Sequence, residues 1–318
     1  MKRIAVLTSG GDAPGMNAAI RAVSRTCLFN GKECLGVMRG YEGLMEGDFI
    51  PLDRVAVGGI IHRGGTILKT ARCERFKQKE YREQAINNMK EAGIEGLVVI
   101  GGDGSYHGAY ELDLMGFPVI GVPGTIDNDI SGTDETIGFD TAVNTALEAL
   151  MRLRDTASSH DRLFIVEVMG RNAGFMALEI AVASGAEYVV VPELPLSIGR
   201  LCELLNYSHK NKKSHTLIIL AEGVMSGEEM KLKLQDTGGY EARVTVLGYI
   251  QRGGSPTSKD AVLASRLGAY ATESLFVGKS GMMVGCINNR MVLSPLERAW
   301  TEHKAISSEL VGLVEKLN

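Results

Sequence analysis

Three short loops in the sequence combine glycine with aspartate in a pattern that suits phosphate and metal chemistry. They read TSGGDAPGMN from Thr8, GGDGS from Gly101 and VPGTIDND from Val122. Glycine lets the backbone approach a phosphate closely, and the free N–H groups at the start of a following helix attract negative charge. Gly11 is therefore the best candidate for a backbone contact in the first loop, although a glycine pair also suits a plain strand-to-helix turn. Together the three loops predict a site for a phosphorylated ligand.

The second and third loops add carboxylates. Asp103 lies among glycines at the expected start of a helix, where it suits Mg²⁺ whose other ligands are phosphate oxygens and water. Asp103 or Ser105 could instead cap that helix. Asp127 and Asp129 are spaced by one, so in an extended segment they point the same way, one toward metal and one toward a substrate hydroxyl. A turn built on Asp-Asn-Asp is the alternative for these residues.

Two later glycine loops carry arginine. They read MGRN from Met169 and QRGGSP from Gln251. A guanidinium in a glycine loop suits bidentate contact with a phosphate. An ordinary surface position is the alternative for each of these arginines, and it applies equally to Arg72, Arg162 and Arg243.

These loops require a scaffold that brings strand ends together. Short apolar runs rich in β-branched residues read as buried strands: Ile4 to Leu7, Leu97 to Ile100, Val119 to Val122, Leu163 to Val168, Tyr188 to Val191, Leu217 to Leu220 and Val244 to Leu247. Longer amphipathic stretches read as helices: Met16 to Phe29, Arg75 to Glu91, Thr136 to Ala157 and Asp260 to Phe276. Strands that alternate with helices imply parallel sheets, with ligands at the carboxyl ends of the strands. We predict an α/β protein of two Rossmann-like three-layer lobes with largely parallel sheets and an active site in the cleft between them.

The composition is that of a globular enzyme. The chain has 318 residues, of which 45% are hydrophobic and 23% charged, with a formal net charge of −4. That charge argues against a general nucleic-acid-binding surface, and no apolar run approaches the roughly 20 residues that a membrane span requires. The cysteines are odd in number and scattered without metal-binding spacing, at Cys27, Cys34, Cys73, Cys202 and Cys286. We expect reduced thiols, no signal peptide, no membrane or nucleic-acid partner, and a cytoplasmic protein.

Seven segments in order resemble the ATP-dependent phosphofructokinase family, over essentially the whole chain. They are LTSGGDAPGMNAAIR, GGTILKTAR, VVIGGDGS, GVPGTIDND, TIGFDTA, EVMGRNAG and LGYIQRGGSP. The resemblance implies transfer of the γ-phosphoryl group of Mg-ATP to the 1-hydroxyl of fructose 6-phosphate, the committed step of glycolysis. It further implies a larger ATP-binding lobe, residues 1–138 with 251–301, and a smaller sugar-phosphate lobe, residues 139–250 with 302–318.

The resemblance also assigns roles to individual residues. It makes Asp127 the general base, with Thr125 and Arg171 steadying the transferred group and Asp129 assisting around the metal. Gly11 and Arg72 join this catalytic set. The implied ATP site consists of Gly11, Arg72, Cys73, Gly102, Asp103, Gly104 and Ser105, with Asp103 as the Mg²⁺ ligand. The implied sugar-phosphate site consists of Thr125, Ile126, Asp127, Arg162, Met169, Gly170, Arg171, Glu222, Arg243, Tyr249, Ile250, Gln251 and Arg252. Because Arg162 and Arg243 reach across from a neighbouring subunit in the family, a homotetramer is implied.

The sequence departs from the family pattern at two places. Tyr249 stands where the family usually has histidine, and tyrosine does not carry histidine's positive charge near neutral pH. Weaker binding of fructose 6-phosphate is therefore expected. The family's effector pocket, where ADP activates and phosphoenolpyruvate inhibits, is matched here by Arg21, Ala22, Val23, Ser24, Arg25, Arg54, Arg154, Gly185, Ala186, Glu187, Asn211, Lys213, Ser214 and His215. Gly58, Gly59 and Asn211 replace polar, acidic or lysine residues of relatives, so a weak effector response is expected.

Other functions remain open from the sequence alone. Family members that use pyrophosphate typically have Asp at the position of Gly104 and Lys at that of Gly124, so the two glycines favour ATP. Tagatose 6-phosphate is an alternative acceptor. A dinucleotide-binding protein fits poorly because the first loop lacks GxGxxG spacing and because the Asp-rich loops would face a pyrophosphate. A non-catalytic regulator with this fold is disfavoured by Asp103, Asp127 and Arg171.

Overall fold

The apolar runs of the sequence form two sheets. The computed structural model describes residues 1–158, 163–210 and 216–317. One sheet contains, in order across it, β11 (Arg290–Pro295), β10 (Met282–Ile287), β5 (Val119–Pro123), β4 (Leu97–Gly101), β1 (Arg3–Thr8), β2 (Glu33–Val37) and β3 (Phe49–Pro51). The other contains β7 (Tyr188–Val190), β8 (Thr216–Ala221), β6 (Leu163–Val168) and β9 (Ala242–Val246). Each sheet belongs to its own unit of the chain.

The pairing within both sheets is mostly parallel. In the larger sheet β1 pairs in parallel with β2 and β4, and β5 pairs in parallel with β4 and β10. Only the outer pairs, β2 with β3 and β10 with β11, are antiparallel. The smaller sheet is parallel throughout. The predicted α/β fold class with largely parallel sheets is confirmed.

Contacts divide the chain into two units. The first unit consists of Met1–Ile126, Ile130–Thr141 and Arg252–Lys304, and the second of Asp127–Asp129, Ala142–Gln251 and Ala305–Asn318. The chain thus passes between the units several times. The domains expected from the sequence, with their assignment to ATP and sugar phosphate, stay a prediction.

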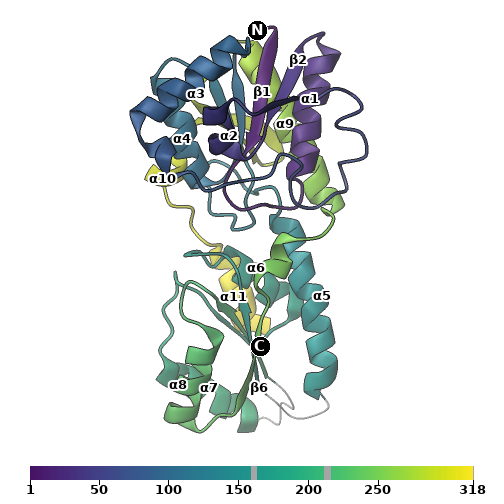
Figure 1. Ribbon diagram of the computed structural model, residues 1–318. Helices are drawn as coiled ribbons and strands as arrows, with labels where there is room; N and C mark the ends of the chain where they lie inside the picture. Colours follow the sequence, from purple (N-terminus) through teal and green to yellow (C-terminus); the bar gives the residue numbers. More distant parts are fainter. Residues whose placement is uncertain (159–162, 211–215, 318) are drawn as a thin grey trace. The chain divides into compact units, whose positions relative to one another are not determined.

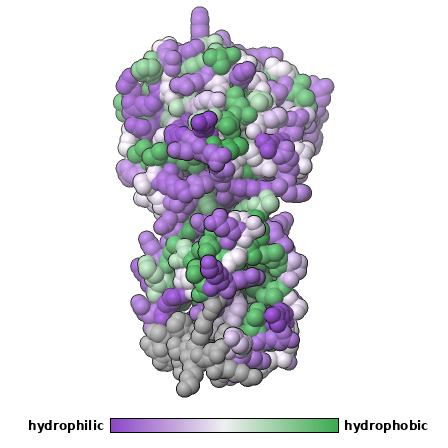
Figure 2. All heavy atoms as spheres, turned by 180° about the vertical axis from the view of Figure 1, so that it is seen from behind, coloured by the Kyte–Doolittle hydropathy of each residue, from purple (hydrophilic) through white to green (hydrophobic). Residues whose placement is uncertain are grey.

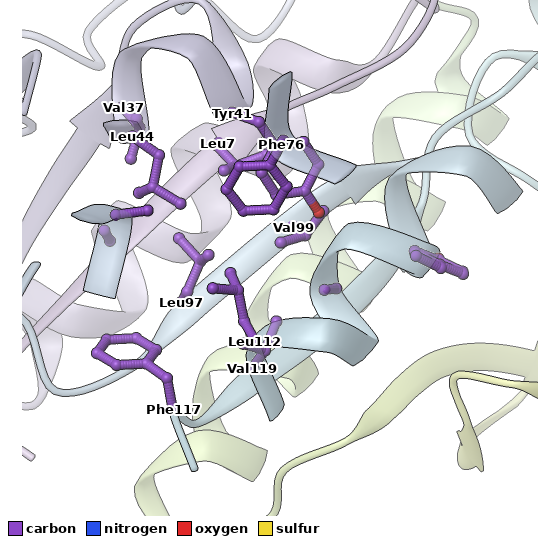
Figure 3. Close-up of a cluster of buried hydrophobic side chains, with 14 of the residues drawn as sticks. Leu7, Val37, Tyr41, Leu44, Phe76, Leu97, Val99, Leu112, Phe117 and Val119 are labelled. Carbon is purple, nitrogen blue, oxygen red and sulfur yellow. The ribbon is translucent and has the colours of Figure 1, made fainter. Parts of the chain in front are cut away.

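Helices cover both faces of the first unit's sheet (Figure 1). Helices α1 (Met16–Phe29) and α9 (Ser258–Phe276) lie on one face, and α2 (Gly40–Glu46), α3 (Lys79–Glu91) and α4 (Asp103–Leu114) on the other. Alternate strand residues point to opposite faces, so each strand supplies two cores. Figure 3 shows the second of these, in which Leu7, Leu97 and Val99 of the sheet pack with Tyr41 and Phe76.

The second unit builds its own core. Its helices are α5 (Phe139–Ser158), whose first residues belong to the first unit, α6 (Phe175–Ser184), α7 (Ile198–Lys210), α8 (Gly227–Gly238) and α11 (Ser308–Leu317). Ile165 and Ile218 of the sheet pack against Leu201 and Leu205 of α7 and Met230 of α8. Each unit therefore has its own sheet and its own core, and each is assembled from three segments of the chain.

Several expected element bounds were wrong. The stretch expected as one helix from Arg75 is split into a short 3-10 helix η1 (Glu74–Lys77) and α3, because Gln78 between them has an extended backbone. Helix α5 begins at Phe139 because Gly138 has a left-handed φ of 101°. The strands β2, β3, β10 and β11 and the short helices α2 and α10 (Arg298–Thr301) were not anticipated.

The surface of the first unit mixes polar and apolar side chains, as Figure 2 shows for one of its faces. Single exposed hydrophobic residues such as Phe29 and Val55 are present. Scattered residues of this kind are ordinary for a globular surface. Within the described ranges, no helix combines the length and the apolar character needed to cross a membrane.

Candidate active site

The three glycine loops of the sequence meet in the first unit at the carboxyl ends of β1, β4 and β5. The Ser9 amide donates to the Ile100 carbonyl at 2.9 Å, and the Gly124 amide donates to the Gly101 carbonyl at 3.0 Å. A Cβ added to Gly102 would lie 3.7 Å from Cβ of Thr125. This is the arrangement that parallel strands impose on the loops following them. The loops that predicted a phosphate site are therefore neighbours.

Arg252 contributes a cation to the first loop. Its Nη1 donates to the Asp12 carbonyl at 3.2 Å, and a Cβ added to Gly11 would lie 2.1 Å from the same nitrogen. The guanidinium therefore lies directly against Gly11. Arg252 is half-buried. The first loop thus combines backbone N–H groups at the start of α1 with a positive charge, which favours an anionic ligand.

Asp103 is the first residue of α4. The N-cap position is Gly102, which has no side chain to cap the helix, so neither Asp103 nor Ser105 is the N-cap residue. Ser105 is buried, whereas Asp103 is half-buried and Gly104 is exposed. A Cβ added to Gly104 would meet no heavy atom within 4 Å. Open space therefore lies next to a carboxylate at a helix N-terminus.

This donor set fits Mg²⁺ bound together with a phosphate ligand. In the part of the chain that the structure describes, no three or more His, Cys, Asp or Glu side chains gather into a metal cluster. Mg²⁺ is commonly held by one or two carboxylates together with phosphate oxygens and water. Asp103 among open glycine backbone supplies such a partial site.

Cys73 lies beside α2, just before η1. Its Sγ is 4.0 Å from Sδ of Met45. Burial and a hydrogen bond to the Glu42 carboxylate raise the pKa of the Cys73 thiol to about 11. The thiol is therefore neutral at physiological pH and serves as a small packing group. The adjoining Arg72 is exposed.

Asp127 is the most buried carboxylate of the third loop. Its side chain is 2% exposed, and its Oδ2 lies 3.3 Å from Nε of Arg171, whose side chain is 52% exposed. A buried carboxylate requires a compensating charge or hydrogen bonds. Asp127 of the VPGTIDND loop and Arg171 of the MGRN loop are thus neighbours in the structure. About half of the Arg171 side chain is exposed to solvent.

Of the two arrangements considered for Asp127 and Asp129, the extended one is not formed, and the alternative, a turn at Asp-Asn-Asp, is closer to the structure. Asn128, between them, has a left-handed backbone with φ of 55°. Asp127 is buried, whereas Asp129 is half-buried. The two carboxylates therefore do not share one environment, because residues two apart point to the same side only along an extended backbone.

Glu222 and Gln251 hold the backbone of the arginine loop. Glu222 Oε1 accepts hydrogen bonds from the amides of Gly170 at 3.2 Å and Arg171 at 2.9 Å. Gln251 Oε1 accepts from the Met169 amide at 2.9 Å. Arg171 itself has a left-handed φ of 51°, a conformation that costs a non-glycine residue energy and persists only where surrounding contacts hold it. Sequence reasoning missed this supporting role, because it assigned both residues only to ligand contact.

The remaining predicted sugar-phosphate residues of the second unit face solvent. Tyr249 is 83% exposed and Ile250 is 56% exposed. Arg243, on the edge strand β9, is also exposed. Arg162 lies outside the described residues. Ile126 and Thr125, assigned to the same site, are buried in the first unit.

The predicted effector residues are distributed over both units. On α1, Arg25 Nη2 donates to the Arg54 carbonyl at 3.1 Å, whereas Ala22, Val23 and Ser24 are buried. In the second unit, Arg154 Nη2 donates to the Gly185 carbonyl at 2.6 Å. Beside it, Ala186 is buried, and Glu187 Oε2 accepts from the Leu217 amide at 2.8 Å. Asn211, Lys213, Ser214 and His215 lie outside the described residues, and Arg21 is half-buried on α1.

Asn17 is a structural residue of the first loop that sequence reasoning did not single out. Its Nδ2 donates to the carbonyls of Arg63 and Gly64, and its Oδ1 accepts from the Ile67 amide at 2.8 Å. These bonds tie the GGTILKTAR segment to the start of α1. The only sequence signal for this role was the position of Asn17 as the last residue of the TSGGDAPGMN segment.

The fold and these loops define a class, that of α/β proteins with a site for phosphorylated ligands built from glycine loops, carboxylates and arginines. Comparison with known families then identifies the particular family. The model described as Phosphofructokinase matches residues 3–275. The chain belongs to the phosphofructokinase family.

Curated relatives match the full length of the chain. One from Shouchella clausii (strain KSM-K16), named ATP-dependent 6-phosphofructokinase, is 53% identical over 318 residues, which is 100% of both chains. Another of that name, from Bacillus subtilis (strain 168), is 56% identical over 292 residues, or 92% of each chain.

Solved structures agree on the fold. A phosphofructokinase from Saccharomyces cerevisiae superposes with a TM-score of 0.89 at 33% identity, covering 100% of this chain and 50% of the yeast chain. The chain thus spans half the length of that relative. A pyrophosphate-dependent phosphofructokinase from Marinobacter aquaeolei has a TM-score of 0.85 at 22% identity, covering 100% of this chain and 91% of that one, and shows the fold alone.

Substitution of Gly124 by alanine is expected to destabilise the protein. An added Cβ would lie 2.9 Å from Cγ2 of the fully buried Ile100 and 3.3 Å from Cε of Met16. Overpacking of this kind costs about 1–3 kcal/mol. Gly104→Ala is the matched control, since its Cβ enters open space. Thermal unfolding should show a lower Tm for Gly124→Ala only, and equal Tm values for the two variants would contradict this packing argument.

Proposed function

We propose that the chain catalyses transfer of the γ-phosphoryl group of ATP to the 1-hydroxyl of fructose 6-phosphate, giving fructose 1,6-bisphosphate and ADP. In this proposal the reaction is a step of glycolysis and takes place in the cytoplasm. The observation that carries this proposal is the pairing of the buried Asp127 carboxylate with Arg171. Support also comes from relatives that match 92% or more of the chain and are named ATP-dependent 6-phosphofructokinase.

Asp127 acts as general base in this reaction. Its carboxylate takes the proton of the 1-hydroxyl while that oxygen forms a bond to the γ-phosphorus. The bond from the γ-phosphorus to the bridging oxygen breaks, and ADP leaves with the electron pair. Thr125 and Arg171 steady the transferred group, and Asp129 assists near the metal. This division of labour suits phosphoryl transfer, which depends mainly on positioning and charge neutralisation.

The first unit holds the nucleotide. Backbone at Gly11 and from Gly102 to Ser105 approaches the phosphates, with Arg72 and Cys73 at the side of the site. Asp103 would hold Mg²⁺, which when bound neutralises charge on the β- and γ-phosphate oxygens. The half-buried Arg252 beside Gly11 supports an anionic ligand at this loop.

The sugar phosphate is held by Met169, Gly170, Arg171 and Glu222, with Arg162, Arg243, Tyr249, Ile250, Gln251 and Arg252 completing the pocket for the 6-phosphate. In this proposal Arg162 and Arg243 come from a neighbouring subunit of a homotetramer. The exposed positions of Arg243 and Tyr249 are compatible with such an arrangement. Regulation by ADP or phosphoenolpyruvate belongs to the same proposal.

ATP is favoured over pyrophosphate as donor. The added Cβ of Gly104 would enter open space, which leaves room for the larger nucleotide next to Asp103. The two curated relatives described above are also named ATP-dependent 6-phosphofructokinase. Pyrophosphate is therefore the second donor to assay.

Removal of the base provides the main test of the mechanism. Asp127→Asn is expected to lower kcat for fructose 1,6-bisphosphate formation by at least about 10²-fold, because the amide cannot accept the proton. The matched control is Asp236→Asn on α8, where the carboxylate is exposed. Unchanged turnover in Asp127→Asn would remove Asp127 from this role, and turnover with pyrophosphate alone would overturn ATP as donor.

Tyr249→His is expected to lower the KM for fructose 6-phosphate. Histidine adds a titratable positive charge at a position where tyrosine is neutral. The exposed side chain at this position makes the substitution compatible with the fold. Steady-state kinetics below pH 7 measure the effect, and Tyr249→Phe controls for the hydroxyl. A KM that does not fall would contradict the assignment of Tyr249 to the sugar-phosphate pocket.

A further inference from the structure

Asp260 is a buried carboxylate that the proposed mechanism does not use. It lies in the first turn of α9 and is 1% exposed. Its Oδ1 accepts a hydrogen bond from the Gly138 amide at 2.9 Å. Its Oδ2 accepts from the Thr141 amide at 2.8 Å and from Thr141 Oγ1 at 2.5 Å. Both oxygens of one carboxylate are thus committed to the start of α5, more than a hundred residues away in sequence.

These bonds have a clear local cause. The first amides of a helix lack partners within the helix and carry a partial positive charge. Gly138 and Thr141 supply two such amides at the start of α5, and Asp260 satisfies them from another helix. Thr141 Oγ1 also accepts from the Thr257 amide at 3.0 Å, and Thr257 Oγ1 donates to Asp140 Oδ2 at 2.6 Å, so further hydrogen bonds join the starts of α5 and α9. Burial raises the pKa of Asp260, and the hydrogen bonds from Thr141 and Gly138 oppose that rise.

The segment that Asp260 holds pairs with the third loop. The Ile137 amide donates to the Pro123 carbonyl at 2.9 Å, and Thr136 Oγ1 donates to the Thr125 carbonyl at 2.6 Å. Thr136 is fully buried. Thr125 precedes Asp127 by two residues. A continuous set of hydrogen bonds and peptide units therefore runs from Asp260 through Gly138 and Thr136 to the backbone that carries the proposed base.

The same anchor touches the first loop. Gly138 has a left-handed φ of 101°, and a Cβ there would lie 2.7 Å from Cβ of Ala13. A Cβ added to Gly15 would lie 2.7 Å from Cγ2 of Ile137 and 3.7 Å from Cβ of Asp260. The anchor is therefore also packed against the residues just before α1.

We propose that Asp260 is a positioning residue for phosphoryl transfer: it fixes the segment from Thr136 to Gly138, and through Thr136 it fixes the backbone at Thr125 that leads to Asp127. This role rests on the proposed function. It differs from a purely stabilising helix cap because the position of Asp127 depends on it. Small displacements of a reacting group lower the rate of the chemical step far more than they lower substrate binding.

The experiment begins with Asp260→Asn in the full chain. The asparagine keeps the shape but turns an NH₂ group toward amide donors that need an acceptor. The expected result is a fall in kcat of about 10-fold, with the KM for ATP within about 2-fold of the unmodified chain. Glu273→Gln is the matched control, because this exposed carboxylate lies on the same helix. Circular dichroism verifies that each variant is folded at the assay temperature.

A mutant cycle separates positioning from general stabilisation. If Asp260 acts through Asp127, then Asp260→Asn should change the residual kcat of Asp127→Asn by less than about 2-fold, because the positioned group is already lost. A loss of kcat equal in both backgrounds would overturn the positioning role. So would a normal kcat in Asp260→Asn itself.

A second pair of variants decides the matter if Asp260→Asn does not fold. Thr136→Val removes the hydrogen bond to the Thr125 carbonyl and keeps the side chain's volume, and Thr136→Ser keeps the hydroxyl. We expect the lower kcat in Thr136→Val and recovery in Thr136→Ser. Equal kcat in both variants would overturn the proposal. Absence of turnover by the unmodified chain with ATP and fructose 6-phosphate would overturn the proposed function and the role of Asp260 with it.

Discussion

The buried charge of Asp127 is the constraint on which the site depends. A carboxylate removed from water is costly unless a cation or hydrogen bonds compensate it. Arg171 supplies the cation, 3.3 Å away. Arg171 has a left-handed backbone, and its amide and that of Gly170 donate hydrogen bonds to Glu222. The arginine is thus held at its backbone by Glu222 and paired at its side chain with Asp127.

The first unit satisfies its polar groups by similar means. Asn17 ties the GGTILKTAR segment to the first loop, and Asp260 ties the start of α9 to the start of α5. Gly124 packs against the fully buried Ile100 and leaves no room there for a side chain. The loops are therefore fixed by contacts between distant parts of the chain. Phosphoryl transfer requires such preorganised loops, because its catalysis depends mainly on positioning and electrostatic stabilisation.

Much of this could be predicted from local sequence, and the rest could not for physical reasons. The fully buried runs at Leu97 and Val119 became central strands, because uninterrupted β-branched residues suit sheets covered on both faces. The loops that contain Gly11, Asp103 and Asp127 could be predicted as well, because they come directly after predicted strands. By contrast, the sequence left both an extended segment and a turn open for Asp127 to Asp129, and the left-handed backbone of Asn128 decides between them. The bonds of Asp260 to α5 likewise span more than a hundred residues and leave no periodic pattern.

The central claim is the reaction itself, and ³¹P nuclear magnetic resonance of the reaction mixture tests it most directly. The purified full chain would be incubated with Mg²⁺, ATP and fructose 6-phosphate. The account predicts that the γ-phosphate signal of ATP declines while signals of ADP and of a phosphate ester on C1 of the sugar grow in equal amounts. Inorganic phosphate in place of the sugar ester, or no loss of the γ-phosphate signal, would contradict the account.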